Sequence, residues 1–226
     1  MMNYRFDWLP IWEARGLIAH GLLMTVAMSM VALAVAIVVG FIVGTGAATG
    51  SRPTRFASAL FVETMRNVPL LIHMYVWYMA LAFLRLPAFA CAVLGLSLYS
   101  GAYVAEVVRA GIGSVRRGQM QAALATGLTR FQAFRFVIYP QALRIISPSL
   151  ASLFSQLIKD SSLASVIAVA ELTYQAGAID GQSFRTFEVY ITIAVIYLIM
   201  VTIASQLVML LPGARNDASS ARFADA

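Results

Sequence analysis

Charged residues are scarce in this sequence of 226 residues: aspartate, glutamate, lysine and arginine make up 12% of it, whereas 61% is hydrophobic. So little charge excludes the usual soluble composition and indicates the membrane class. The single cysteine, Cys91, excludes an internal disulfide. The single lysine, Lys159, is not part of a Gly-x-x-x-x-Gly-Lys phosphate-binding loop. The chain therefore cannot hydrolyse ATP by that chemistry.

Long runs of uncharged residues make up much of the sequence. The longest covers residues 16–51, well beyond the ~20 residues that cross a bilayer, and four more cover 67–84, 86–105, 145–158 and 189–214. The sequence therefore predicts an all-α integral membrane protein with about five transmembrane helices. The apolar stretch 161–172 is too short to span and is interpreted as a re-entrant or interfacial helix.

The beginning of the sequence does not have the features of a secretory signal peptide. It carries Asp7 and Glu13, has no basic cluster, and leads into an apolar run that is too long. We expect no cleavage there.

Arginine is unevenly distributed along the chain. Six arginines and no acidic residue occur between Val107 and Arg144, which places this segment in the cytoplasm under the positive-inside rule. Counting spans from it puts the "GSRPTRF" turn and the C-terminus inside, and the N-terminus and the "RLP" turn outside. We accordingly expect an external segment over 1–16, a transmembrane domain over 17–214 with a basic region at 114–140, and a cytoplasmic tail over 215–226.

The basic region is predicted to contain two short helices. Residues 119–126 are good helix formers, and Gly127 follows where a left-handed cap would end a helix. Thr129 and Gln132 have the spacing of a capping box that begins a second helix. That helix would end or kink at Pro140 and would present one apolar side, made of Phe131, Phe134 and Ile138.

Two simple interpretations of the basic region compete. A basic helix-turn-helix could bind DNA, but neighbouring spans leave no room for the third helix of a soluble core. A basic loop held at the lipid headgroups needs no partner at all.

Several stretches together resemble one known family. "FVETMRNVPLLIHMYVWY", "SLYSGAYVAEVVRAGIGSVRRGQ", "VIYPQALR" and "KDSSLASVIAVAEL" look like successive signatures of ABC importer permeases of the polar-amino-acid branch. The cytoplasmic loop of that family carries Glu-Ala-Ala, three residues, Gly, nine residues, Ile, one residue and Leu-Pro. Four residues of this motif are present, and Gln121, Val137 and Tyr139 replace its Glu, Ile and Leu; the matches are Ala122, Ala123, Gly127 and Pro140.

The resemblance implies a transport subunit of a bacterial inner-membrane importer rather than an enzyme. The implied cargo is a polar amino acid, with glutamate/aspartate or glutamine as the best guess. The implied partners are a cytoplasmic ATPase dimer that carries ATP and Mg²⁺, a second permease subunit, identical or different, and an external amino-acid-binding protein. No cofactor is expected in this chain, and no nucleic acid. A helix over 119–128 would dock on the ATPase through Arg116, Arg117, Gln121, Ala122, Ala123, Gly127 and Pro140.

Polar residues at membrane depth are costly and are candidates for a substrate path. The candidates are Arg66, Pro69, Tyr99, Tyr103, Glu106, Asp160, Ser161 and Ser162. Pro69 disfavours helical geometry at Val68, so the chain there could expose backbone groups to a substrate or simply bend. Local ion pairs are the alternative for Glu63–Arg66 and Glu106–Arg109, which are spaced i,i+3. Asp160 adjoins Lys159 at i,i+1, and such side chains point apart on a helix.

Two other function classes remain open from the sequence. A secondary transporter also uses broken helices and buried charges, but no internal repeat is detectable here. An intramembrane enzyme would need a nucleophile with a base, or a metal cluster. The sequence has no Gly-x-Ser-x-Gly turn, and His20 and His73 are far apart.

Overall fold

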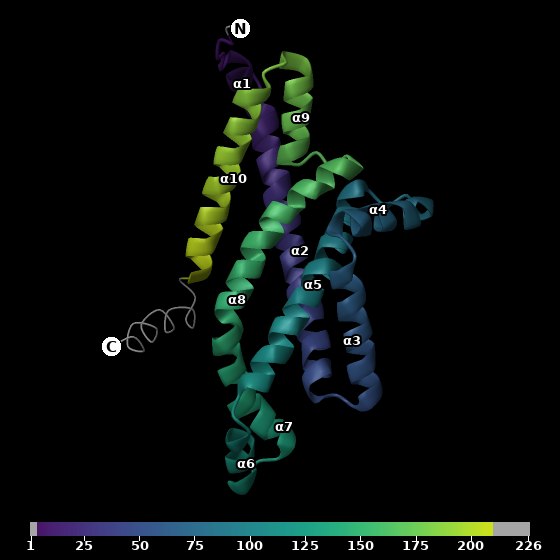
Figure 1. The fold of residues 1–226 in the computed structure, drawn as a ribbon, viewed down its shortest axis with the longest axis vertical. Coiled ribbons are helices and arrows are strands. Elements are labelled where there is room, and N and C mark those ends of the chain that lie inside the picture. The colour runs from purple at the N-terminus through teal and green to yellow at the C-terminus, as the bar shows by residue number, and fades with distance from the viewer. Residues whose placement is uncertain (1–3, 210–226) are drawn as a thin grey trace, which may run out of the picture. The chain divides into compact units, whose positions relative to one another are not determined.

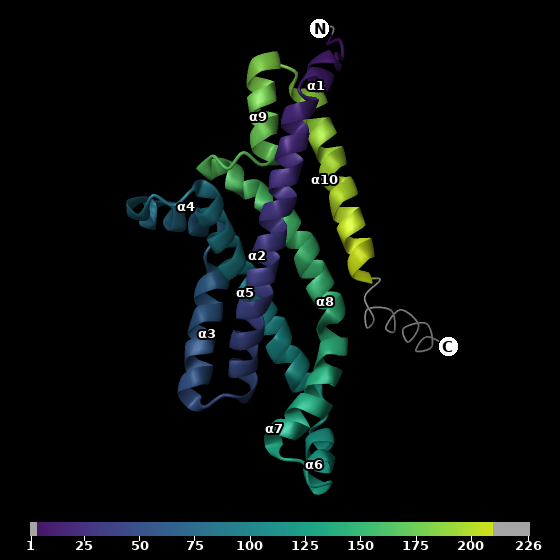
Figure 2. The same ribbon diagram turned by 180° about the vertical axis from the view of Figure 1, so that it is seen from behind.

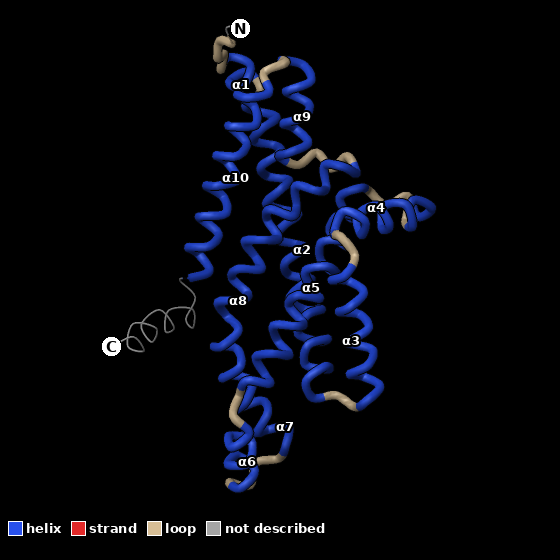
Figure 3. The backbone as a smooth tube through the Cα atoms, in the orientation of Figure 1, coloured by secondary structure: helices blue, strands red, loops and turns tan. Residues whose placement is uncertain are grey.

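The computed structural model describes residues 4–209. All regular elements within this part of the chain are helical and no strand occurs there (Figure 3), which confirms the all-α class. In chain order (Figure 1) they are α1 (Leu9–Glu13), α2 (Arg15–Thr49), α3 (Arg52–Asn67), α4 (Leu70–Ala80), the 3₁₀ helix η1 (Ala82–Leu84), α5 (Ala88–Ser114), α6 (Arg117–Ala125), α7 (Arg130–Ala133), the π-helix η2 (Phe134–Ile138), α8 (Tyr139–Asp160), the 3₁₀ helix η3 (Ser161–Ile167), α9 (Leu172–Ser183) and α10 (Thr186–Met209). The expected tail, 215–226, lies outside the described residues.

Three described helices are long and apolar enough to cross a bilayer. They are α2 with 35 residues, α5 with 27, and the 22 residues Thr186–Leu207 of α10. A fourth span is present if Arg130–Ile167 and Leu172–Ser183, which meet at a bend of 51°, count as one. These elements correspond to the first, third, fifth and fourth predicted spans.

The second predicted span is shorter than the uncharged run 67–84 suggested. Helix α4 has 11 residues, which extend only about 17 Å at 1.5 Å per residue. The break before it lies at Val68, whose backbone is extended (φ −102°, ψ 132°) ahead of Pro69. This is the restriction that a proline places on the residue before it.

The predicted "GSRPTRF" turn is also largely helical. Arg52 already begins α3, and Pro53 lies in its first turn, where the missing N–H of proline costs no hydrogen bond. The stretch 161–172 contains η3 and then a break, in which Ala168 adopts a left-handed conformation (φ 60°) before Glu171 caps α9.

The chain forms two compact units, each assembled from separate stretches of sequence. The first contains residues 1–33, 69–96 and 156–203. In both views of the ribbon, α9 and α10 lie beside the first part of α2 (Figures 1 and 2). Their buried core consists of Leu172, Ala176, Ile179, Val189 and Ile193.

The N-terminal segment of this unit is held to the start of α10 by polar contacts. The buried carboxylate of Glu188 accepts hydrogen bonds from the Tyr4 hydroxyl and, at 2.8 Å, from the Asp7 backbone N–H. The hydrogen bond to Glu188 raises the pKa of the Tyr4 hydroxyl. Arg185 donates to the Arg5 carbonyl at 2.9 Å.

The second unit contains, among the described residues, 34–68, 97–155 and 204–209. Glycines let α2 and α5 approach closely within it. A Cβ atom at Gly40 would lie 2.4 Å from Val104, and one at Gly44 would lie 2.5 Å from the Ala105 carbonyl oxygen. The spacing of the two glycines is that of a small-residue helix-packing motif in membranes.

Candidate functional site

The two short helices of the basic region lie together in the second unit, and we call residues 115–138 the basic helix pair (Figures 1 and 2). Helix α6 ends as predicted at Gly127, which has a left-handed backbone (φ +88°). The Gly127 N–H donates to the Leu124 carbonyl at 3.0 Å, and the Leu128 N–H donates to the Ala123 carbonyl at 3.3 Å. These two bonds form a Schellman motif, which fixes the end of the helix.

The second helix of the pair begins with the predicted capping box. The Thr129 N–H donates to the Gln132 Oε1 at 2.9 Å, and the Gln132 N–H donates to the Thr129 Oγ1 at 3.3 Å. Ala123 and Ala133 are buried as α6 packs on α7 and η2. A cap on either side of a two-residue turn therefore fixes the direction of α6.

The outer surface of the basic helix pair is basic with small and apolar residues between the charges. Gln121 and Ala122 are exposed, and so are the arginines at 116, 117, 130 and 135. Within residues 4–209 no ion pair joins these arginines to an acidic side chain. The three residues of the predicted apolar side differ in exposure: Ile138 is buried, Phe134 is half-buried and Phe131 is 74% exposed.

Of the two predicted effects of Pro140, an end or a kink of the helix, the helix does not end there. The chain widens into the π-helix η2 before it, where the Tyr139 N–H donates to the Phe134 carbonyl, and α8 continues beyond. The Gln141 side chain donates to the Val137 carbonyl at 2.9 Å. The wider turn makes room for the proline's ring, which would clash with the preceding turn of a regular α-helix.

Four of the substrate-path candidates lie in the second unit. The Arg66 guanidinium lies over the Tyr103 ring, 5.0 Å from its centroid, and the Tyr99 and Tyr103 hydroxyl oxygens are 3.2 Å apart. Glu106 pairs with Arg109 at 2.5 Å, as the local-pair alternative proposed. Glu63 instead accepts from Asn67 at 2.9 Å, so the proposed Glu63–Arg66 pair does not form among the described side chains.

Asp160, Ser161 and Ser162 lie in the first unit, where α8 passes into η3. The half-buried Asp160 carboxylate accepts from Gln156 Nε2 at 2.7 Å. The Ser161 and Ser162 hydroxyls donate to backbone carbonyls three residues earlier, each at 2.7 Å. Their donors are satisfied locally, while their lone pairs can still accept a hydrogen bond.

Sequence reasoning missed the most buried polar cluster of the first unit, which is centred on Glu171. Its carboxylate is 0% exposed and accepts from the Thr173 and Tyr174 N–H groups at 2.9 and 2.7 Å and from the Tyr197 hydroxyl at 2.9 Å. The Thr25 hydroxyl lies 3.5 Å from it. The one local signal for this cluster is that Glu171 stands directly before "LTYQ", at the N-cap position of a helix. Its other partners, Thr25 and Tyr197, are distant in sequence.

No group of three or more His, Cys, Asp or Glu side chains that could hold a metal ion occurs among residues 4–209. His73 is buried within α4.

Residues 36–213 match the model of a family described as a binding-protein-dependent transport system inner membrane component. The chain is 39% identical over 182 residues to the probable glutamine ABC transporter permease protein GlnM of Bacillus subtilis, covering 80% of this chain and 84% of that protein. It is 37% identical over 205 residues to the glutamine transport system permease protein GlnP of Escherichia coli, covering 89% and 94%.

A solved amino acid ABC transporter, crystallised with histidines, has the same fold. The two chains superpose with a TM-score of 0.84 at 35% sequence identity, covering 92% of this chain and 98% of that one.

Proposed function

The chain belongs to the family of binding-protein-dependent transport system inner membrane components, and we propose that its cargo is glutamine. As a member it is a multi-pass inner-membrane permease subunit of an ABC importer for polar amino acids, and ATP is hydrolysed by a separate subunit. Glutamine is favoured because two relatives named for glutamine transport align over 84% and 94% of their own lengths.

The proposed coupling surface is the exposed side of the basic helix pair. Small side chains at Ala122 and Gly127 allow close approach by a partner, and caps at both ends of the turn hold α6 in one direction. Acidic residues to match the exposed arginines would have to come from the partner. These properties suit a lever that docks on a cytoplasmic ATPase through Arg116, Arg117, Gln121, Ala122 and Gly127. Of the other two predicted coupling residues, Ala123 is buried on the inner side of α6 and Pro140 lies in the first turn of α8.

The proposed orientation follows from the same arginines. With the basic helix pair in the cytoplasm, residues 1–16 lie outside, the transmembrane domain covers 17–214, and the tail over 215–226 lies inside. The excess of arginine without acid between residues 107 and 144 supports this assignment.

The family implies an assembly with an ATPase and a binding protein. We further propose that the complex contains a second permease subunit. Purifying the tagged chain with and without other permease subunits, and determining the mass of the complex, distinguishes an identical copy from a different one.

The residues proposed for a substrate path form two groups, one within each unit. In the second unit the exposed Arg66 guanidinium can bind the carboxylate of an amino acid, and Tyr99, Tyr103 and Glu106 provide acceptors for its ammonium group. In the first unit, Pro69 is the N-cap of α4, and the half-buried Asp160 and the lone pairs of Ser162 provide further acceptors. Ser161, the remaining candidate, is fully buried beside them.

Uptake by the reconstituted complex tests the proposed cargo. The permease is combined in proteoliposomes with a candidate ATPase and glutamine-, glutamate- and histidine-binding proteins in turn. We expect ATP-dependent uptake of glutamine and stimulation of ATP hydrolysis by the glutamine-loaded binding protein. Uptake of glutamate or histidine alone would contradict glutamine as the cargo.

A further inference from the structure

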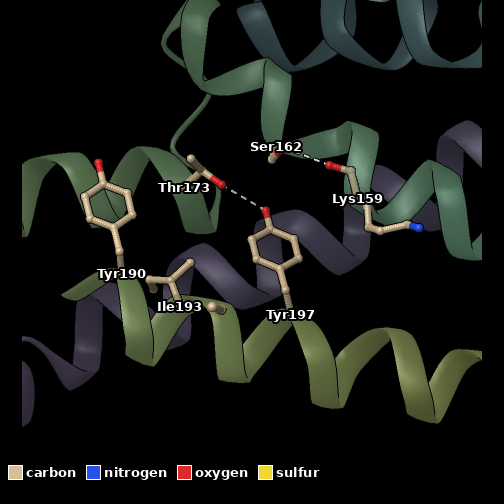
Figure 4. Close-up of a pocket in the computed structure, with 7 residues that line it drawn as sticks. Lys159, Ser162, Thr173, Tyr190, Ile193 and Tyr197 are labelled. Atoms are coloured by element: carbon tan, nitrogen blue, oxygen red, sulfur yellow. Dashed lines mark hydrogen bonds between the residues drawn. The ribbon is translucent and has the colours of Figure 1, made fainter. Parts of the chain in front are cut away.

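A pocket of about 290 Å³ opens beside α10 in the first unit, away from the basic helix pair in sequence (Figure 4). Four of its lining residues belong to α10 and three to the segment from the end of α8 to the start of α9: Tyr190, Ile193, Ala194, Tyr197, Lys159, Ser162 and Thr173. Two tyrosine rings with Ile193 and Ala194 between them make one wall of this pocket, which is apolar.

Most of the polar groups at the pocket already have partners. The Thr173 and Tyr197 hydroxyl oxygens lie 3.1 Å apart, and Tyr197 donates to Glu171 at 2.9 Å (Figure 4). The Ser162 hydroxyl donates to the Lys159 carbonyl at 2.7 Å. A ligand of this pocket therefore cannot be recognised mainly through these hydroxyl groups.

The Lys159 ammonium is the charged group at the pocket. It is exposed, and Figure 4 shows it extending away from the tyrosine rings. No ion pair joins it to an acidic residue in the part of the chain that the structure describes. The adjacent Asp160 carboxylate is occupied by Gln156. A cation beside an apolar pocket matches a ligand with an anionic head and an apolar tail.

The helix that carries the pocket faces outward along an apolar surface. Ile191, Val195 and Leu198 are 46%, 48% and 67% exposed. Tyr190 comes four residues after Thr186, where α10 begins, or about 6 Å along the helix axis. A tyrosine at the end of a span is typical of the headgroup level of a bilayer, and a lysine side chain can extend along apolar surface toward that level.

We propose that this pocket binds an anionic phospholipid, whose phosphate pairs with the Lys159 ammonium and whose acyl chain lies against Ile193 and Ala194 between the two tyrosine rings. A protein partner fits less well, because it would bury the lysine charge unless it supplied a matching acid. This lipid site is separate from the coupling surface, and it shares only Ser162 with the proposed substrate path.

Native mass spectrometry of the permease–ATPase complex, titrated with phosphatidylglycerol in detergent, tests the proposal. We expect one tightly bound lipid per permease chain. Lys159→Gln should weaken its binding about fivefold, the factor that one basic residue contributes at an anionic surface, and Lys159→Arg should retain it. Ala194→Trp should remove the lipid by filling the pocket.

Val195→Trp is the matched control, because Val195 is the next residue of the same helix and does not line the pocket. It should bind phosphatidylglycerol as the unsubstituted protein does. Equal binding by all variants would overturn the proposal. So would a disulfide between two permease chains through Ala194→Cys in a Cys91→Ala background, since a second copy of the chain would then occupy the pocket.

Discussion

The Tyr197 hydroxyl of α10 donates a 2.9 Å hydrogen bond to the carboxylate of Glu171, which caps the first turn of α9. Thr25 of α2 joins the same cluster, because its hydroxyl oxygen accepts from the Leu172 N–H at 3.1 Å. Three helices of the first unit thus meet at one buried carboxylate. A buried polar network is stabilising only while every member keeps its partners.

Glu171→Ala should lower the melting temperature of the purified complex more than Tyr197→Phe. The alanine variant leaves two backbone N–H groups and a tyrosine hydroxyl without their acceptor, at about 1–3 kcal/mol each, whereas the phenylalanine variant loses about 1 kcal/mol. Tyr190→Phe is the control, since Tyr190 is on the same helix and is 45% exposed. Equal melting temperatures for Glu171→Ala and the control would show that the cluster does not stabilise the fold.

Gly127→Val should leave the protein inserted in the membrane but abolish the stimulation of ATP hydrolysis by loaded binding protein. Valine is strained at the φ of +88° found here, so the turn that directs α6 would be lost. Gly118→Val is the control, because a Cβ atom there also meets open space but its backbone is helical. Normal transport by Gly127→Val would show that residues 115–138 act only as a basic loop held at the lipid headgroups.

Gln121→Glu should be neutral or slightly increase coupling between ATP hydrolysis and transport. Gln121 lies in the second turn of α6, four residues after Arg117, so it is too far from the helix start for the dipole to matter. A glutamate there could pair with Arg117 at i,i+4, worth about 0.2–0.5 kcal/mol. The ratio of amino acid imported to ATP hydrolysed provides the measurement, and a clear loss of coupling would contradict this expectation.

Asp160→Asn should reduce transport about tenfold, if the charge contacts the substrate with the energy of a charge-assisted hydrogen bond. The asparagine side chain keeps an oxygen that can accept from Gln156 as the carboxylate does at 2.7 Å, so the variant removes mainly the charge. Insertion, measured by the amount of protein in washed membranes, should be unchanged. Unaltered uptake would leave Asp160 with a local structural role.

Labelling from the two sides of the membrane tests the proposed orientation. In a Cys91→Ala background, Ser114→Cys at the end of α5 should react with impermeant thiol reagents only from the cytoplasmic side. Ser183→Cys at the end of α9 should react only from the exterior. The reverse pattern would invert the topology.

Local signals in the sequence predicted local structure well. Gly127 ends a helix and Thr129 with Gln132 begins the next, because each of these caps involves residues within a few positions of one another. The uncharged runs likewise predicted the long helices α2, α5 and α10.

Features that depend on distant residues or on the interruption of a helix were not predictable in the same way. The Glu171 cluster joins residues that are 146 positions apart, and no motif relates them. Pro140 was expected to end or kink its helix, and a π-helix before it, which the sequence did not indicate, lets the helical backbone continue into α8. Pro69 did indicate the break at Val68 between α3 and α4, but hydropathy alone does not reveal that α4 ends at Ala80, before the uncharged run 67–84 does.

The glycine contacts between α2 and α5 restrict how the second unit can move. With only hydrogen atoms at Gly40 and Gly44, the backbones are already in contact at Val104 and Ala105, and neither helix can slide past the other without separating first. Helix α5 leads directly into α6 through Val115 and Arg116. A force applied to α6 would therefore displace this section of α5 together with the α2 section packed on it, as one rigid arm rather than as two helices in turn.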